Sequence, residues 1–256
     1  MFGQLFDAAG NRILWLDATD RAGETDFGQQ KVIGHELAGI CRLEQELTAV
    51  LFRGPRGLRA LFWNVDGSFE SVCGNAIRCL AHFRSRGMGF NGEVSVETPR
   101  GIYLSRRVDD RIGAAWIPAQ SVRVGRPFAN GDLFVDVGTP HVIRKVQEDW
   151  PEADVLHAVE RSSGAEAVNF NLVRRIASLQ YRVRVFERGV GETFSCGTSA
   201  VAVAAVLGAK TLPEGGRRAD HQIEFASGEQ LTVSLNPSGG FYELSGRVAI
   251  LQEVSV

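Results

Sequence analysis

One stretch of the sequence predicts a helix that is apolar on every side. Residues 197–209 read Gly-Thr-Ser-Ala-Val-Ala-Val-Ala-Ala-Val-Leu-Gly-Ala, so small and branched apolar residues follow one another without a polar face. Such a helix has about three turns, which is too short to cross a membrane. We therefore expect it to lie in the centre of a folded domain, surrounded by protein.

Cys196 stands immediately before this helix. Residues 181–186 alternate apolar residues with arginines, as a strand does, and Gly189 and Gly191 end that pattern. The first N–H groups of a helix lack internal partners and carry partial positive charge, so a buried helix start can hold a carboxylate. A thiol in that place has a lowered pKa and can act as a base or nucleophile. This segment alone fits a buried structural cysteine equally well.

A second copy of this strand, turn and cysteine-helix sequence favours a functional cysteine over a structural one. Residues 64–83 again predict a strand, an Asp-Gly turn and a cysteine at a helix start. Residues 73–76, Cys-Gly-Asn-Ala, echo residues 196–199, Cys-Gly-Thr-Ser. The two cysteines are 196 − 73 = 123 positions apart, close to half of the 256 residues. The repeat predicts a duplicated domain with one site at its pseudo-twofold axis.

The rest of the chain predicts many strands and few helices, which indicates an α+β fold. We expect two similar domains, each a mixed sheet around its cysteine helix. The first is residues 1–117 with a closing strand at 244–256, and the second is 118–243, because residues 118–127 contain two prolines. Further helices are predicted at 30–41 and 149–158, and the helix that follows Cys73 should end at Arg86 with Gly87 as its cap. Strands are predicted at 13–16, 46–52, 58–64, 93–98, 101–108, 112–116, 133–137, 167–174, 222–225, 230–235 and 242–245.

The two cysteine blocks resemble the signature motifs of the diaminopimelate epimerase family. The motifs are Asn64-x-Asp66-Gly67-Ser68 before Cys73-Gly74-Asn75, and Glu187-Arg188-Gly189-x-Gly191-Glu192-Thr193 before Cys196-Gly197-Thr198. The resemblance covers most of the chain and is strongest in these blocks. It implies two pseudo-symmetric barrels, each around a central helix. It also implies an enzyme that inverts the α carbon of LL-diaminopimelate to the meso form, for lysine and cell-wall precursor synthesis.

The paired cysteines suit proton removal from an amino acid without a cofactor. No lysine lies in a glycine-rich phosphate loop, so we expect no pyridoxal phosphate and no other cofactor. The α-carboxylate would be held by backbone N–H groups of the two helix starts, which belong to Gly74, Asn75, Gly197 and Thr198. One thiolate, of Cys73 or Cys196, would take the proton from one face while the other thiol supplies a proton to the opposite face.

The resemblance assigns the far end of the substrate to a set of polar residues: Asn64, Asn169, Glu187, Arg188 and Thr139. Thr139 departs from the family, which has Gly-Asn-Pro-His where this chain has Gly-Thr-Pro-His, and a hydroxyl cannot replace the two N–H donors of an amide. Asn11 and Gln45 are further candidates for substrate binding. Their surroundings also depart from the family pattern, with Ala8, Ala9 and Arg12 around Asn11 and a missing glycine before Gln45.

Three alternatives remain open at this point. A racemase of the same fold could act on another amino acid, as the departures at Thr139 and Asn11 suggest. A hydrolase could use Cys73 or Cys196 as its nucleophile with His141 as the base, and it would need only one cysteine. A binding protein of the same fold could lack activity, although the intact pair of cysteines argues against it.

Composition and charge exclude several other classes. The formal net charge of −2 gives no reason to expect a nucleic-acid partner. Cys73 and Cys79 are six residues apart on one helix, without the spacing of a metal site, and we expect Cys41 and Cys79 to be core thiols. The N-terminus predicts no signal peptide and no membrane association, so the expected compartment is the cytoplasm, where thiols stay reduced. The expected partner is a small amino-acid substrate, and a homodimer is an open alternative to a monomer.

Overall fold

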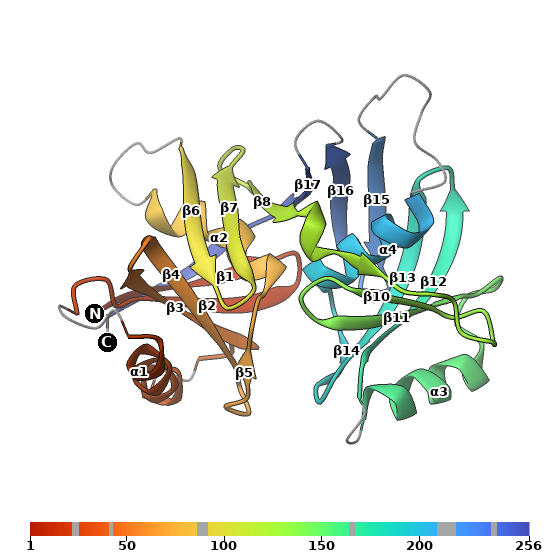
Figure 1. Cartoon of the computed structure of the whole chain (residues 1–256), viewed down its shortest axis with the longest axis horizontal. Helices are drawn as coiled ribbons and strands as arrows, with labels where there is room; N and C mark the ends of the chain where they lie inside the picture. The colour runs from red at the N-terminus through yellow and green to blue at the C-terminus, as the bar shows by residue number, and fades with distance from the viewer. Residues whose placement is uncertain are drawn as a thin grey trace. The chain divides into compact units, whose positions relative to one another are not determined.

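The chain divides into two compact units. A computed structural model describes residues 1–21, 26–40, 43–85, 92–163, 167–208, 219–236 and 240–255 (Figure 1). Unit 1 is Met1–Trp116 with Ser245–Val256, and unit 2 is Ile117–Leu244. The division falls within β8 (Ile112–Pro118) and β17 (Phe241–Arg247). The boundary expected after residue 117 lies in the same strand, β8.

Unit 1 is built from three antiparallel hairpins. These hairpins are β1–β2, β3–β4 and β6–β7, and the parallel pairs β2–β3 and β4–β6 join them. β18 pairs with β1, β5 with β4, and β8 with β7. The bounds are β1 Phe2–Ala8, β2 Asn11–Asp17, β3 Leu47–Gly54, β4 Gly57–Asn64, β5 Phe69–Glu70, β6 Glu93–Thr98, β7 Gly101–Arg107 and β18 Ala249–Ser255.

Unit 2 repeats this connectivity. Its hairpins are β10–β11, β12–β13 and β15–β16, and the parallel pairs β11–β12 and β13–β15 join them. β9 pairs with β10, and β14 with β13. The bounds are β9 Arg123–Val124, β10 Leu133–Asp136, β11 Pro140–Lys145, β12 Asn169–Ala177, β13 Gln180–Glu187, β14 Gly191–Thr193, β15 Ala219–Phe225 and β16 Gln230–Asn236, with a short 3-10 helix at Ala119–Ser121.

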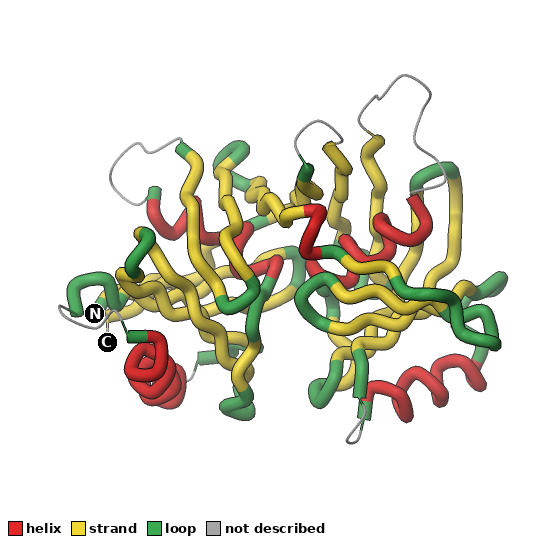
Figure 2. Tube along the Cα trace, in the orientation of Figure 1, coloured by secondary structure: helices red, strands yellow, loops and turns green. Residues whose placement is uncertain are grey.

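The helices occupy matching places in the two units. α1 (Phe27–Ile40) and α3 (Glu152–Ser162) each connect the first hairpin to the second, while α2 (Gly74–Arg84) and α4 (Gly197–Gly208) each connect the second hairpin to the third. Strands predominate between them in both units (Figure 2). Among the residues described, no helix has the length and apolar character needed to cross a membrane.

The cysteine helices α2 and α4 are the buried ones, as the sequence predicts. Within unit 1, α2 packs against β1, β2, β6 and β7, and within unit 2, α4 packs against β10, β11, β12, β15 and β16 (Figure 1). The α2 backbone lies so close to β8 that a side chain at Gly113 would be 2.3 Å from the carbonyl oxygen of Arg78. At its start α2 is fixed by Trp15, whose indole N–H donates to the Ala76 carbonyl at 3.1 Å.

Two predicted helix limits are wrong for identifiable reasons. α2 ends at Arg84 because Ser85 caps it, with its backbone N–H donating to the carbonyls of Ala81 and His82, so the predicted end at Arg86 is too late. Helix α3 begins after Pro151, because Trp150 has a φ of 55° and a residue before proline disfavours the helical region.

The remaining cysteines and His82 can be placed only in part. Cys79 is fully buried in α2, as expected of a core thiol, whereas Cys41 lies outside the described residues, as does Gly87. His82 is buried on the same helix, and its Nε2 lies 3.2 Å from the carbonyl oxygen of Ile112. The His82 contact is thus to β8 and not to the start of α2.

Candidate active site

Cys73 is the N-cap residue of α2. Its backbone is extended, with φ −132° and ψ 112°, and its Sγ accepts a hydrogen bond from the Ala76 N–H at 3.5 Å. The side chain is half-buried, whereas Gly74 and Asn75 in the first helical turn are buried. The sulfur therefore shares the helix start with backbone N–H groups that favour negative charge.

Arg78 brings a buried positive charge to the same end of α2. Its guanidinium donates to Asn75 Oδ1 at 2.8 Å and to the carbonyl oxygens of Ala8 and Arg247, both at 3.2 Å. These contacts connect the first turn of α2 to β1 and to the end of β17. A fixed guanidinium there adds to the partial positive charge of the helix start, and no local sequence pattern distinguishes Arg78 from other helix residues.

Cys79 does not share these properties, although it is on the same helix. Its Sγ donates to the carbonyl oxygen of Asn75 at 3.3 Å. Burial raises the pKa of the Cys79 thiol from its ordinary value of 9.0 to about 12. Cys79 therefore stays protonated at neutral pH and cannot serve as a base there.

Asn64 is the last residue of β4, at the start of the turn that leads to Cys73. Its Nδ2 donates to Ser68 Oγ at 2.9 Å and to Glu70 Oε1 at 3.4 Å. Hydrogen bonds from the side chain and backbone of Ser68 lower the pKa of Asp66 in the same turn. Asn64 is thus held in place by its own turn.

Asn11 and Gln45 lie at the starts of neighbouring parallel strands in unit 1. Asn11 begins β2, and its Nδ2 donates to Glu46 Oε2 at 2.7 Å, an oxygen that also accepts the Arg12 N–H at 3.0 Å. Gln45 precedes β3, is buried, and donates to Thr48 Oγ1 at 3.4 Å. The Asn11 amide therefore supports the local turn, and a role of either residue toward a substrate stays a prediction.

Cys196 has a different environment at the start of α4. It is only 5% exposed, and its thiol donates to Glu187 Oε2 at 3.4 Å. The other carboxylate oxygen, Oε1, accepts the Thr193 hydroxyl at 2.6 Å. On its other side, the Cys196 sulfur lies 3.2 Å from Thr198 Oγ1. Cys196 is therefore placed between a carboxylate and a hydroxyl.

Behind Thr198 lies His141, which is fully buried on β11. Its Nε2 lies 3.1 Å from Thr198 Oγ1, 3.2 Å from Thr139 Oγ1 and 3.4 Å from Asn169 Nδ2. Burial lowers the pKa of the His141 imidazole from 6.5 to about 3. The ring is therefore neutral at physiological pH.

Asn171 contacts the other ring nitrogen of His141. The Asn171 Nδ2 lies 3.2 Å from His141 Nδ1 and also donates to the Val142 carbonyl at 3.0 Å, while its Oδ1 accepts the Ser199 hydroxyl. The amide nitrogens of Asn171 and Asn169 thus lie beside the two ring nitrogens, Nδ1 and Nε2 respectively. The neutral imidazole is held between these amides and the hydroxyls of Thr139 and Thr198.

Asn169 and Arg188 are joined through the backbone. Asn169 Oδ1 accepts the backbone N–H of Arg188 at 2.8 Å, while the Arg188 residue as a whole is exposed. Thr139 is 8% exposed and uses its hydroxyl toward His141.

Unit 1 thus has Cys73, Gly74 and Asn75 at the start of α2, with Asn64 at the end of β4 before the connecting turn. Unit 2 brings together around the start of α4 a larger set, which is Thr139, Asn169, Glu187, Arg188, Cys196, Gly197 and Thr198.

Sequence reasoning missed part of the polar support in unit 2. Asn171 and Ser199 were not candidates, and His141 was considered only as the base of a hydrolase. Asn169 and Asn171 are two residues apart on β12, so the period of a strand places both on one face. That pattern could have identified Asn171 once Asn169 was a candidate.

Comparisons with known proteins identify the family of this chain. Residues 133–244 match the family model described as diaminopimelate epimerase. The diaminopimelate epimerase of Xanthomonas euvesicatoria pv. vesicatoria is 30% identical over 244 residues, which cover 86% of this chain and 84% of that protein. Other curated relatives carry the same name, among them a protein of Acidothermus cellulolyticus that is 37% identical over 161 residues, 59% of this chain and 52% of that protein.

Solved structures match the fold over the full chain. A hydroxyproline epimerase from Agrobacterium vitis gives a TM-score of 0.71 at 15% identity, with 100% of this chain and 90% of that one covered. These similarities confirm the α+β fold and the isomerase class expected from the sequence. The chain belongs to the diaminopimelate epimerase family and is an amino-acid epimerase.

Proposed function

We propose that this protein is a cofactor-independent diaminopimelate epimerase in which Cys73 and Cys196 act on opposite faces of one α carbon. The observation that carries the proposal is the repeat itself, because both units place a cysteine directly before a buried helix between their second and third hairpins. The names of the curated relatives support the substrate. In this role the enzyme serves lysine and cell-wall precursor synthesis in the cytoplasm, where its thiols stay reduced.

The carboxylate of the substrate is the group that the two helix starts suit. Backbone N–H groups of Gly74 and Asn75 on α2, and of Gly197 and Thr198 on α4, can donate to its oxygens. Negative charge grows on this carboxylate when the α proton leaves. Donors that are already fixed stabilise that charge without reorganisation, and the buried Arg78 adds a positive charge.

The contacts of the two sulfurs suggest which one is protonated at rest. The Cys196 sulfur donates toward the Glu187 carboxylate, so this contact requires a thiol. The Cys73 sulfur accepts from the Ala76 N–H, a contact that a thiolate strengthens. We therefore assign the resting thiolate to Cys73 and the resting thiol to Cys196. Cys73 then removes the proton while Cys196 supplies one, and the reverse reaction exchanges these roles.

A second candidate is the same chemistry on a different amino acid, and Thr139 favours it. The Thr139 hydroxyl contacts His141 and has no amide N–H groups to offer a distal substrate group. An unpaired buried polar group costs about 1–3 kcal/mol, which is enough to change the preference between substrates. The other proposed distal residues, Asn64, Asn169, Glu187 and Arg188, are present.

The geometry gives less support to a cysteine hydrolase. Its base would be His141, but that ring has a pKa of about 3, and its Nε2 contacts the hydroxyls of Thr198 and Thr139. The Thr198 hydroxyl is the group that connects the imidazole to the Cys196 sulfur. A neutral imidazole in this orientation is not placed to remove the thiol proton.

The proposal is tested by incubating the reduced protein in heavy water with LL-diaminopimelate. Formation of the meso isomer with deuterium at the inverted α carbon supports it. A parallel panel of other amino acids identifies the second candidate, because the favoured substrate then gains α-deuterium while diaminopimelate does not. Absence of α-deuterium in every substrate would rule out both candidates.

A further inference from the structure

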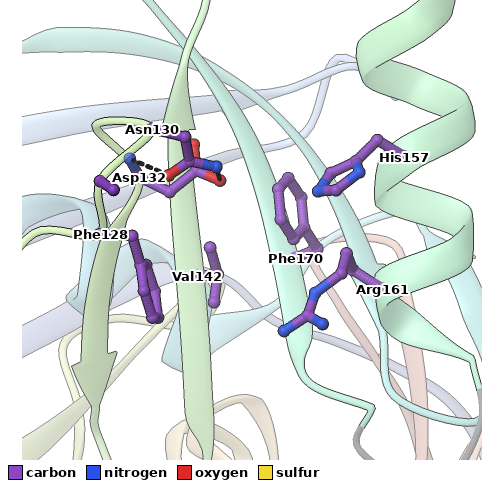
Figure 3. A pocket seen from close by; sticks show the side chains of 8 residues that line it. Phe128, Asn130, Asp132, Val142, His157, Arg161 and Phe170 are labelled. Carbon is purple, nitrogen blue, oxygen red and sulfur yellow. Dashed lines mark hydrogen bonds between the residues drawn. The ribbon is translucent and has the colours of Figure 1, made fainter.

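Unit 2 contains a cavity of about 420 Å³ that the proposed reaction does not use (Figure 3). It lies between α3 and the segment before β10 that contains Phe128 and Asp132. Its lining includes Val142 from β11 and Phe170 from β12. Binding sites for small molecules have volumes of about 300–1,000 Å³, so this cavity has the size of a ligand site.

The floor and walls of the cavity are mostly apolar and aromatic. Val142 and Phe170 are paired across the parallel strands β11 and β12, and both are buried. His157 of α3 meets the Phe170 ring edge-on, with centroids 5.4 Å apart and planes at 79°. Phe128 lies on the other side of Val142 and is 47% exposed (Figure 3). The space therefore suits a flat apolar group.

The two charged side chains that line the cavity, Asp132 and Arg161, differ in their pairing. Asp132 is 5% exposed, but Arg144 donates to both of its oxygens, at 2.9 and 2.8 Å, and Asn130 donates to Oδ2 at 2.9 Å. Asp132 thus has a cationic partner, which it shares with Asp154, 2.9 Å from the same guanidinium. Arg161 also lines the cavity, and its guanidinium makes no ion pair or hydrogen bond with any other residue that the structure describes. Arg161 therefore brings to the cavity a positive charge that no described carboxylate pairs with.

We propose that this cavity binds a small aromatic monocarboxylate. The ring lies over Val142 between Phe128 and Phe170, and the carboxylate accepts from the guanidinium of Arg161, whose fork matches two carboxylate oxygens. An ammonium group would be repelled by Arg161, whereas a carboxylate would pair with it. The Arg161 guanidinium thus favours an anionic ligand, and the aromatic lining favours a ligand with a flat ring.

The position of the cavity connects it to the Cys196 environment. Val142 follows His141 on β11, and Phe170 lies between Asn169 and Asn171 on β12. Alternate residues of a strand point to opposite faces, so the cavity is on the reverse face of the two strands that hold the His141 network. A molecule bound there rests against the backbone that positions these polar side chains.

The probe for the test is 1-naphthoate, titrated into the reduced full-length protein by calorimetry and by amide chemical-shift mapping. We expect saturable binding, with the largest shifts at Val142, Phe170 and Arg161. Replacing the carboxylate with a neutral hydroxymethyl group should weaken binding about tenfold or more, because a charge-assisted bidentate contact is lost. Saturating diaminopimelate should leave the naphthoate affinity unchanged.

Two variants and a control separate the charge from the shape of the cavity. Arg161→Gln should weaken naphthoate binding about tenfold or more, and Phe128→Ala should weaken it several-fold while keeping the preference for the anion. Arg123→Gln removes the same charge from an exposed position of unit 2 outside the cavity and should change nothing. Any of three results would overturn the proposal. These are binding that does not saturate at millimolar 1-naphthoate, an unchanged affinity in Arg161→Gln, and chemical-shift changes centred on Gly197 and Thr198.

Discussion

The two cysteines hold equivalent places in the two units, yet their sulfurs have different neighbours. Cys73 follows the second hairpin of unit 1 and accepts from a backbone N–H of its own helix. Cys196 follows the second hairpin of unit 2 and lies between the Glu187 carboxylate and the Thr198 hydroxyl. The same connectivity thus gives one sulfur a backbone donor and the other a side-chain acceptor.

This difference shows how two copies of one fold can provide one thiol suited to act as the acid and one thiolate suited to act as the base. Acid and base must be in opposite protonation states when the substrate arrives. A helix start alone favours the thiolate, whereas a carboxylate beside the sulfur favours the thiol. The side chains that contact the two helix starts also differ in charge. Asn75 of unit 1 is bound by the buried guanidinium of Arg78, whereas Thr198 of unit 2 contacts the neutral imidazole of His141.

The largest effect is expected when either sulfur is removed. Cys73→Ser and Cys196→Ser should each lower the rate of inversion by about 10²–10⁴, because a hydroxyl is a far weaker acid than a thiol. The measurement is the rate of meso-diaminopimelate formation under reducing conditions. Cys79→Ala is the matched control and should retain activity, since that thiol is fully buried and its pKa of about 12 keeps it protonated. An equal loss in the control would show that the helix, not the sulfur, had been damaged.

A smaller effect is expected when the carboxylate beside Cys196 is neutralised. Glu187→Gln should lower kcat/KM about tenfold or more, because a hydrogen bond to a charged group is replaced by a weaker one. The pH profile of kcat/KM should change as well, because Glu187 influences the proton on Cys196. The comparison variant in unit 1 is Asn64→Asp. Asn64 ends β4 as Glu187 ends β13, so this variant introduces a carboxylate at the equivalent position before Cys73. An unaltered pH profile in Glu187→Gln would contradict the proposed difference between the two sulfurs.

Thr139 should control which substrate is preferred. Thr139→Asn supplies an amide that can donate two hydrogen bonds, so the ratio of kcat/KM for diaminopimelate to that for the next best amino acid should rise about tenfold. Thr139→Ser keeps the hydroxyl that contacts His141 and serves as the control. A ratio that stays the same in Thr139→Asn would remove Thr139 from the specificity argument.

The smallest expected effect concerns stability and His141. Its folded-state pKa of about 3 is below the unfolded value of 6.5, so the unfolded state binds the extra proton between these values. The contribution of neutral His141 to the free energy of unfolding is full above pH 6.5 and is lost as the pH falls toward 3. His141→Gln should reduce the slope of that free energy against pH by up to about 1.4 kcal/mol per pH unit in this window. Denaturant titrations at several pH values provide the test, and an unchanged slope would contradict the shift.

The sequence predicted the repeat and the buried helices because apolar periodicity and glycine positions are local signals. It placed a strand at residues 58–64 and a helix after Cys73, and both are present as β4 and α2. Short elements such as β5 and β14 escaped prediction, since two or three residues carry no measurable periodicity. The start of α3 was misplaced because the left-handed conformation of Trp150 leaves no trace in composition.

The surroundings of the site were harder to predict than the cysteines themselves. Arg78 looks like an ordinary helix residue in the sequence, and only tertiary packing shows that it is fully buried and bound to Asn75 and Ala8. His141 and Ser199 are 58 positions apart (199 − 141), and Asn171 joins them only after β11, β12 and α4 have packed together. Long-range polar contacts of this kind have no local pattern.

The stereochemistry of solvent deuterium uptake in Cys73→Ser and Cys196→Ser tests the two-base claim most directly. Each variant keeps the backbone donors for the carboxylate and one thiol, so it should still exchange the α proton from one face. Incubation of LL- and meso-diaminopimelate in heavy water should therefore give deuterium preferentially at one configuration in one variant and at the opposite configuration in the other, with inversion lost in both. One variant that is inactive and another that retains full epimerase activity would contradict the account.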